Sequence, residues 1–142
     1  LHETPDADRN WNALSLPYQP LVGLQHSLSA ADVHVVSLGE GMVGIIHPCK
    51  VYGAMAVGRP VLYFGPSPSH IADLLSEHRF GRQVRHGDVA GAVEAIRELR
   101  ATSPAERDEM GRQGAEALRR LLSQGILCNQ FCDRLEGAMC MD

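Results

Sequence analysis

The sequence predicts an α/β fold in which helices cover both faces of an open parallel sheet. Short apolar runs rich in β-branched residues alternate with segments of helical periodicity, and this alternation of strands and helices is typical of such folds. The helical segments also carry start and stop signals of the expected kinds. At 142 residues the chain has the length of one domain with a sizeable core, so we expect residues 1–142 to form a single domain.

Four runs are predicted to be strands. They are residues 11–16 (WNALSL), 32–38 (DVHVVSL), 59–65 (RPVLYFG) and 80–85 (FGRQVR). The third run is the clearest, because Pro60 stands at the strand entrance, where its missing N–H costs little. Ligands of open parallel sheets bind at the carboxyl ends of the strands, so the loops after Leu38 and after Phe64 are the expected place for a site.

Helical periodicity fills the intervals between these runs. Helices are expected from Pro20, with Leu21, Leu24, Leu28 and Ala31 on one face, from Pro48 to about Val57, from Ser69, from Asp88, from Ser103 to about Leu122, and finally after Gly125 with Leu127, Phe131 and Leu135. Ser103, Pro104 and Glu106 have the pattern of a capping box with proline at the first helical position. Gly58 is placed to cap the helix that begins at Pro48.

Residues 37–64 (SLGEGMVGIIHPCKVYGAMAVGRPVLYF) carry the strongest chemical signal. A buried strand ends, glycines at 39, 41 and 44 let the backbone approach a ligand, and a helix begins at Pro48 with free N–H groups at Cys49 and Lys50. These N–H groups and the positive end of the helix dipole form an anion site of the kind that binds phosphate. Lys50 adds a full positive charge there. Such a site holds a diphosphate without a metal, so no metal and no cofactor is implied.

Composition excludes several other classes. With 13 basic against 17 acidic residues and no tight cluster of Lys or Arg, nucleic acid is not an expected partner. No apolar run approaches the roughly 20 residues that span a bilayer. The four cysteines include no CxxC pair, which indicates reduced thiols in a cytosolic chain. Cys128 and Cys132 are expected to pack as helix thiols rather than to bind a metal.

Two histidines stand at informative positions. His47, directly before the predicted helix start, is equally consistent with a ligand contact and with an ordinary loop residue. His34 lies in mid-strand, where we expect a hydrogen-bonded or edge-facing side chain rather than a catalytic base. The histidines at 26, 70, 78 and 86 show no triad or metal spacing, and none of them is singled out.

The string HPCKVYGAMAVGRPVLYFG (residues 47–65) resembles the PSK…YG…AAGRPV segment of family 4 glycosyltransferases, which build bacterial surface polysaccharides. Further similarity lies in LPYQPL (16–21), LSAADVHVVSL (28–38) and GRQVRHGD (81–88), in the family's order, so that the resemblance covers most of residues 11–100. It implies the latter part of the C-terminal, donor-binding domain of a GT-B enzyme. The implied fold is a partial Rossmann-like, three-layer sandwich with a parallel sheet that lacks its first strands.

The same resemblance implies a role for each part of the site. The amides of Cys49 and Lys50, after Pro48, would hold the distal phosphate of a nucleotide diphosphate sugar. The sugar would face Gly44, Ile45, Ile46 and His47, and the base would lie near Tyr18 and Gln19. The implied donor is a UDP-sugar rather than a GDP-sugar, the transfer is retaining, and the acceptor is lipid-linked or a polysaccharide. The whole enzyme would be cytoplasmic, or peripheral at the inner membrane.

The first departure from the family pattern concerns ribose recognition. Many members carry an acidic pair across the loop and helix, and its second member binds the ribose hydroxyls. Here the corresponding positions hold Ile45 and Gly53. Glu40 lies five residues before Ile45 and either substitutes for the absent acid or is a solvent-facing loop residue.

The second departure is length. A complete domain of this kind has six parallel strands. The whole enzyme also has a separate N-terminal domain, which carries catalytic groups. The chain begins at Leu1 without an initiator Met, so we expect it to be cut from something longer and to be inactive alone. The strand at 32–38 would then expose an edge, and bare edges recruit partners. We expect either that residues 11–16 pair with this edge or that two chains form a homodimer there.

Two other functions stay open on the residues alone. A sugar-nucleotide epimerase shares the GT-B architecture and has a similar phosphate-binding site. It needs carboxylates and a histidine that converge from both domains. A non-enzymatic, flavodoxin-like binding module needs an acidic pocket at the strand ends, whereas Asp32 sits at the entrance of its strand.

Overall fold

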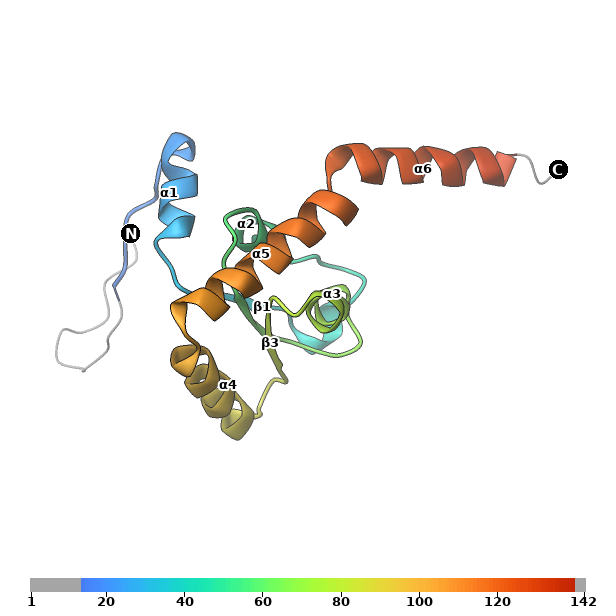
Figure 1. Cartoon of the computed structure of the whole chain (residues 1–142). Coiled ribbons are helices and arrows are strands. Elements are labelled where there is room, and N and C mark those ends of the chain that lie inside the picture. The colour runs from blue at the N-terminus through green and yellow to red at the C-terminus, as the bar shows by residue number, and fades with distance from the viewer. Residues whose placement is uncertain (1–13, 140–142) are drawn as a thin grey trace.

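The computed structural model of the chain describes residues 14–139 (Figure 1). Its centre is a parallel sheet of three strands, β1 (His34–Ser37), β2 (Val61–Phe64) and β3 (Gly81–Val84), in the order β1-β2-β3. His34 is in register with Val61, and Val61 with Gly81. The predicted α/β class with an open parallel sheet is therefore confirmed.

Helices connect and extend these strands. In chain order they are α1 (Leu24–Ser29), preceded by a 3-10 turn (Leu21–Gly23), α2 (Lys50–Ala56), α3 (His70–His78), α4 (Val89–Ala101), α5 (Pro104–Leu121) and α6 (Gln124–Met139). A second 3-10 turn, Glu40–Met42, lies in the glycine-rich loop after β1. The chain thus forms two successive units, β1-α2-β2 and β2-α3-β3, before it continues as helices only.

One face of the sheet is covered by α2, α3 and α5. The alternation of side chains along a strand sends Val36, Val61 and Tyr63 to this face. They form the larger core with buried residues of the three helices, among them Met55, Ile71 and Ala117, and with Phe80 just before β3.

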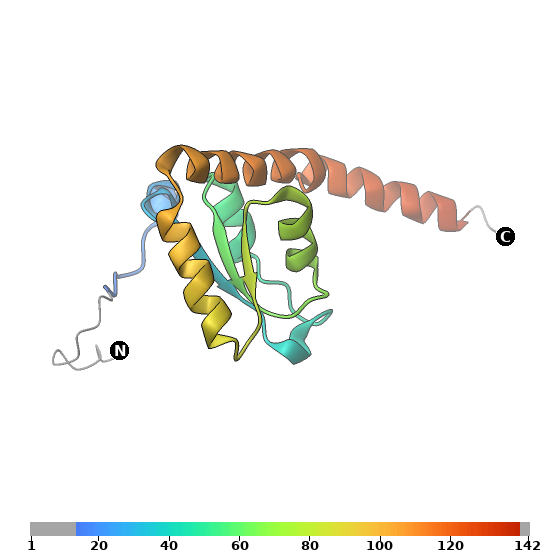
Figure 2. The same ribbon diagram turned by 60° about the horizontal axis from the view of Figure 1, so that its bottom comes forward.

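The other face carries α4, with Met110 of α5 beside it, so that helices lie on both sides of the sheet (Figure 2). Leu62 and Val84 pack there against Ala95 and Leu99, which are buried on α4. The cover is incomplete, because Val35 on β1 is 63% exposed and Ile96 on α4 is 51% exposed. A hollow of about 380 Å³ lies between them.

Local sequence signals place the helix ends. Ser69 and Asp88 cap α3 and α4, since their side chains accept hydrogen bonds from the amides of Ala72 and Gly91. Ser103 and Glu106 form the predicted capping box of α5. After α2 the amides of Gly58 and Arg59 donate to Met55 and Ala54, with Gly58 at φ +64°, which is a Schellman motif.

A close contact between α2 and α5 depends on two glycines. A Cβ atom on Gly111 of α5 would collide with the carbonyl oxygen of Gly58. Glycine at position 111 therefore lets α5 lie directly on the turn that ends α2. Arg59 adds to this junction, because its guanidinium donates to the Ser29 carbonyl at 2.9 Å and lies 3.7 Å from the Asp108 carboxylate.

Two predicted elements differ in the structure. Residues 14–16 of the predicted first strand have no regular structure, and residues 11–13 lie outside the described part. A strand needs a neighbour for its backbone hydrogen bonds, and the β-favouring run meets none here. The second helix begins at Lys50, two residues after Pro48, because residues 48 and 49 form a turn whose carbonyls accept from Val51 and Tyr52.

The outer edge of β1 is not paired in the described chain, since β1 is the first strand in the sheet order. The expectation that the first predicted strand moves over to this edge is wrong for residues 14–16, which carry no strand. A homodimer through the edge stays a prediction.

Helix α6 points away from the rest of the described residues in both views (Figures 1 and 2). Its apolar side chains Leu127, Phe131 and Leu135 are 45%, 63% and 49% exposed. Cys128 and Cys132 are also exposed, so the expectation that they pack against other helices is wrong. Residues 14–139 therefore do not fully cover the apolar side chains of this helix.

Candidate functional site

The loops that follow the three strands converge at the carboxyl edge of the sheet. This is the end of the sheet away from α5 in Figure 2. Two side chains tie the loops together: the His86 ring is hydrogen-bonded to the Leu38 carbonyl (Nε2···O 2.8 Å), and Gln83 donates to the Gly65 carbonyl at 3.1 Å. The first bond joins residues 48 positions apart. Residues from β3 and its loop thus fix the points where the chain leaves β1 and β2.

The glycine-rich loop after β1 is ordered by its own turns. The amide of Met42 donates to the Gly39 carbonyl, and the amides of Ile45 and Ile46 both donate to the Met42 carbonyl. Gly44 has φ +80°, a conformation that favours glycine. The loop leaves Ile45 and Ile46 76% and 56% exposed. Glu40 is exposed at the start of the 3-10 turn and makes no ion pair with residues 14–139.

Cys49 and Lys50 stand at the beginning of α2, and both are exposed. The amides of the next two residues, Val51 and Tyr52, already donate to Pro48 and Cys49. The amides of Cys49 and Lys50 have no acceptor among the described residues. Lys50 is the single lysine of the sequence, and its ammonium is in no ion pair within residues 14–139. Two donors and one free positive charge are therefore available at this point.

A cluster of three rings lies beside this helix start. The ring of His47 is stacked on Tyr52 of α2, with centroids 5.2 Å apart and planes at 26°. His47 Nε2 and the Tyr52 hydroxyl are hydrogen-bonded at 2.5 Å. The ring of His70, the first residue of α3, lies 5.2 Å from that of His47 at 50°. We name these residues the His47–Tyr52–His70 cluster.

The surroundings change the acidity of two of these groups. Partial burial lowers the pKa of His47, and the neighbouring His70 lowers it further, because two protonated imidazoles repel each other. Partial burial also raises the pKa of Tyr52, with a smaller contribution from Cys49. The imidazole of His47 and the phenol of Tyr52 are thus both biased toward their neutral forms.

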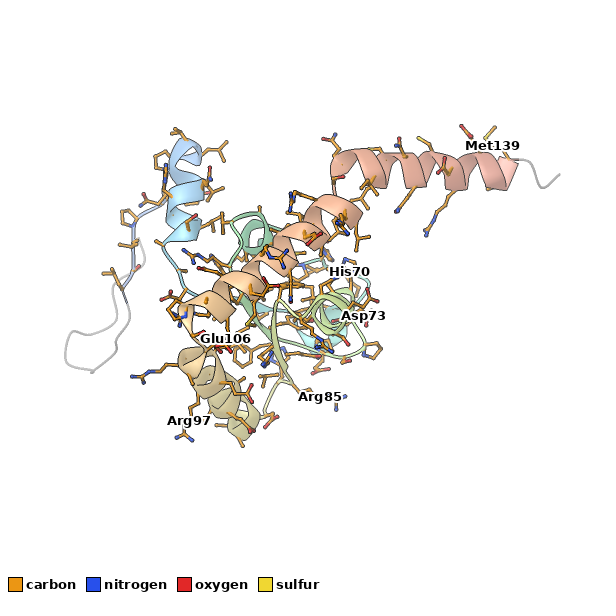
Figure 3. All side chains as sticks on the ribbon, viewed as in Figure 1. His70, Asp73, Arg85, Arg97, Glu106 and Met139 are labelled. Carbon is orange, nitrogen blue, oxygen red and sulfur yellow. The ribbon has the colours of Figure 1, made fainter. Side chains whose placement is uncertain are left out.

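Hydrogen bonds to the core fix the beginning of α3, where His70 lies. Tyr63 is fully buried, and its hydroxyl is hydrogen-bonded to Ser69 Oγ at 3.1 Å. Ser69 caps α3 by accepting from the Ala72 amide at 3.3 Å. Because His70 directly follows Ser69, these contacts from β2 fix the backbone at His70, whose side chain is labelled on α3 in Figure 3.

The structure brings together some of the predicted site residues and leaves others apart. Gly44, Ile45, Ile46, His47, Pro48, Cys49 and Lys50 all lie on the loop and turn between β1 and α2, as the sequence implies. Tyr18 and Gln19 line a separate hollow beside α1, of about 290 Å³. No hydrogen bond or aromatic contact of the described residues joins either of them to the glycine-rich loop. Their placement near a base stays a prediction.

Sequence reasoning passed over several residues of this edge. His70 and His86 have no informative spacing along the chain, but each follows a different strand, and the carboxyl ends of parallel strands meet. That rule is the signal that would have found them. His34, by contrast, has the expected hydrogen bond, from its ring to the Leu28 carbonyl at 2.9 Å.

Within residues 14–139 no group of three His, Cys, Asp or Glu side chains is arranged to hold a metal ion. Of the helices in the same part of the chain, none is long and apolar enough to cross a membrane.

Comparison with known proteins gives one informative similarity. The chain is 31% identical over 80 residues to the probable glycosyltransferase WbjE of Pseudomonas aeruginosa. The match covers 56% of the chain and 20% of that protein, so the chain corresponds to about a fifth of its relative. No protein-family model matches the chain. No solved structure matches it either.

Proposed function

We propose that the chain is the nucleotide-sugar-binding part of a glycosyltransferase. It would hold the donor at the carboxyl edge of its sheet, for transfer of a glycosyl group by the whole enzyme. The observation that carries this proposal is the start of α2, where two amides and the ammonium of Lys50 follow a glycine-rich loop and have no partner within residues 14–139. The similarity to a probable glycosyltransferase supports the glycosyl-transfer part.

The arrangement suits a diphosphate for physical reasons. Free N–H groups at the beginning of a helix donate to phosphate oxygens, and the helix dipole favours negative charge there. Helix α2 has only seven residues, so its dipole alone is a weak attraction. Lys50 supplies the stronger contribution, since a hydrogen bond between charged groups is about twice as strong as a neutral one.

The remaining positions of the donor follow from the chain direction. Gly44 to His47 lie directly before the phosphate position and would face the sugar, with Glu40 close to it in the sequence. Tyr18 and Gln19 would approach the base. A UDP-sugar as donor, retaining chemistry, a GT-B architecture for the whole enzyme and a lipid-linked or polysaccharide acceptor are parts of the same proposal, and they rest on the resemblance to family 4.

A calorimetric titration with UDP, GDP and inorganic phosphate tests the proposal. UDP is expected to bind, and Lys50→Ala is expected to weaken binding by about 1 to 3 kcal/mol, the value of a charge-assisted hydrogen bond. Arg97→Ala is the matched control, because it removes one positive charge from the outer side of α4 (Figure 3). The control variant should bind UDP as the original chain does.

Two results would count against the proposal. If UDP and GDP both fail to bind the folded chain, residues 14–139 do not form a donor site by themselves. If Lys50→Ala and Arg97→Ala weaken binding equally, the attraction is a general effect of charge and not a contact at the start of α2.

A further inference from the structure

We propose that His47 and His70 form one anion subsite, which binds a phosphate-type dianion between two protonated imidazole rings and takes up protons on binding. The inference deepens the proposed function and rests on it for the natural ligand, the phosphate next to the sugar in a nucleotide diphosphate sugar. His47 would then contact this phosphate as well as the sugar. The subsite itself rests on the geometry of the His47–Tyr52–His70 cluster.

The two rings come from different elements and reach the same place. His47 lies on the loop after β1, and His70 is the first residue of α3, after β2. Their centroids are 5.2 Å apart. The two histidines are far apart in the sequence. They lie close together because both follow strands whose carboxyl ends meet at the same edge of the sheet.

Tyr52 orients one ring and leaves a nitrogen free. It stacks on His47 and is hydrogen-bonded to Nε2, which leaves Nδ1 as the free ring nitrogen. Neither ring nitrogen of His70 has a hydrogen-bond partner within residues 14–139. Once protonated, His47 Nδ1 and the two nitrogens of His70 are all donors without acceptors. An anion with several oxygens can accept from both rings.

The charges around the pair are known from the elements that pack against it. Cys49, Lys50 and Tyr52 come from the start of α2, and Asp73 lies in the first turn of α3, three residues after His70. Figure 3 shows His70 and Asp73 on the same helix. No ion pair within residues 14–139 involves His47, His70, Lys50 or Asp73. No carboxylate of the described residues therefore neutralises Lys50 or the two imidazoles.

Proton uptake follows from the interaction between the rings. The pKa of His47 is lowered by burial and by repulsion from His70, so the two rings by themselves resist double protonation. A dianion between the rings replaces this repulsion with attraction to both, and it raises the pKa of each. By linkage, a ligand that raises these pKa values binds more tightly as the pH falls.

The experiment uses sulfate as the probe, because sulfate keeps its double charge between about pH 5 and pH 8, where histidine titrates. The ring protons of all histidines are followed by NMR across this range, with and without sulfate. The titration midpoints of His47 and His70 are expected to rise by about one pH unit, the effect of an opposite charge within contact distance. Because the contributions of the two histidines multiply, sulfate affinity is expected to rise by about 25-fold from pH 7.5 to pH 5.5.

Variants separate this subsite from general attraction of anions. His47→Gln and His70→Gln should each lower the pH dependence to that of the one remaining histidine, and His26→Gln on α1 should leave it unchanged. All three side chains are exposed, so the variants are expected to fold, and the backbone spectrum checks this. Inorganic pyrophosphate and UDP are then added in separate titrations at pH 5.5.

The outcomes distinguish the two proposals. If sulfate and pyrophosphate move the His47 and His70 midpoints but UDP does not bind, the subsite stands and the proposed function is wrong. If UDP binds while both midpoints stay in place, or if the two Gln variants keep the full pH dependence, the subsite is wrong and the proposed function stands. If none of these anions binds, both are wrong.

Discussion

Helices α2, α3 and α5 bury one face of the sheet, whereas α4, with Met110 of α5 beside it, lies on the other. Val61 and Tyr63 of β2 are fully buried on the first face, and Val35 of β1 is 63% exposed on the second. The three-helix face can therefore hold the fold by its own packing. The α4 face and the adjoining edge of β1 retain apolar surface that residues 14–139 do not cover.

The difference between the faces also locates the site. The His47–Tyr52–His70 cluster lies where the loops leave the well-packed face, with Tyr52 on α2 and His70 on α3. A ligand at this edge would contact side chains whose backbones are fixed by the larger core. The sparsely covered face offers no such support.

The largest effect is expected from Gly111→Val on α5. The new side chain would collide with the Gly58 carbonyl and separate α5 from α2, so the free energy of unfolding should fall by about 3 kcal/mol or more. Gly125→Ala is the control, because a Cβ there meets nothing within 4 Å. Urea denaturation measures both variants, and equal stabilities would contradict the close packing of α2 and α5.

A matched pair of truncations compares the two faces directly. Met55→Ala removes a fully buried side chain from the three-helix face and should cost about 2 to 5 kcal/mol. Val35→Ala removes an exposed side chain from the other face and should cost less than about 0.5 kcal/mol. A large loss for Val35→Ala would mean that something covers this face in solution.

Tyr63→Phe tests the link between the core and the site. It removes the hydroxyl that is bonded to Ser69 and leaves the buried cap with one partner fewer, at a cost of about 1 kcal/mol. The amide signals of Ser69 and His70 should move with it. If stability falls without a change at His70, the contact stabilises the core and does not position the cluster.

The smallest effect concerns pH. The pKa of His47 is lowered on folding, so the unfolded chain binds more protons as the pH falls below about 6.5. This contribution to stability is present above that pH and is lost below it. Urea denaturation at pH 7.5 and pH 5.5 should show a smaller pH dependence for His47→Gln than for the original chain. A pH dependence unchanged by this substitution would contradict the lowered pKa.

Local signals explain what the sequence could predict. Ser69, Asp88 and Ser103 start their helices, because a capping side chain bonds to an amide only two or three residues away. The predicted strand at 11–16 was wrong for residues 14–16, because strand formation depends on a neighbouring strand that no local pattern reveals.

Long-range contacts explain what the sequence could not predict. The glycine-rich loop and Lys50 follow from sequence order, but the approach of His70 to His47 depends on the register of β1 and β2. The same holds for the bond between His86 and Leu38. For helix α6 the local signal was sufficient and the long-range one was missing. Its apolar pattern predicted a helix, but it did not indicate which surface the apolar side chains would contact.

Mapping of backbone amide signals during a UDP titration tests the central claim most directly. We expect the largest changes at Cys49, Lys50 and His70 and in the glycine-rich loop, with little change at Arg59 and Gly111 at the other end of α2. This result would place the donor at the carboxyl edge of the sheet. Changes centred on α4 or α5, or no changes in a folded chain, would contradict it.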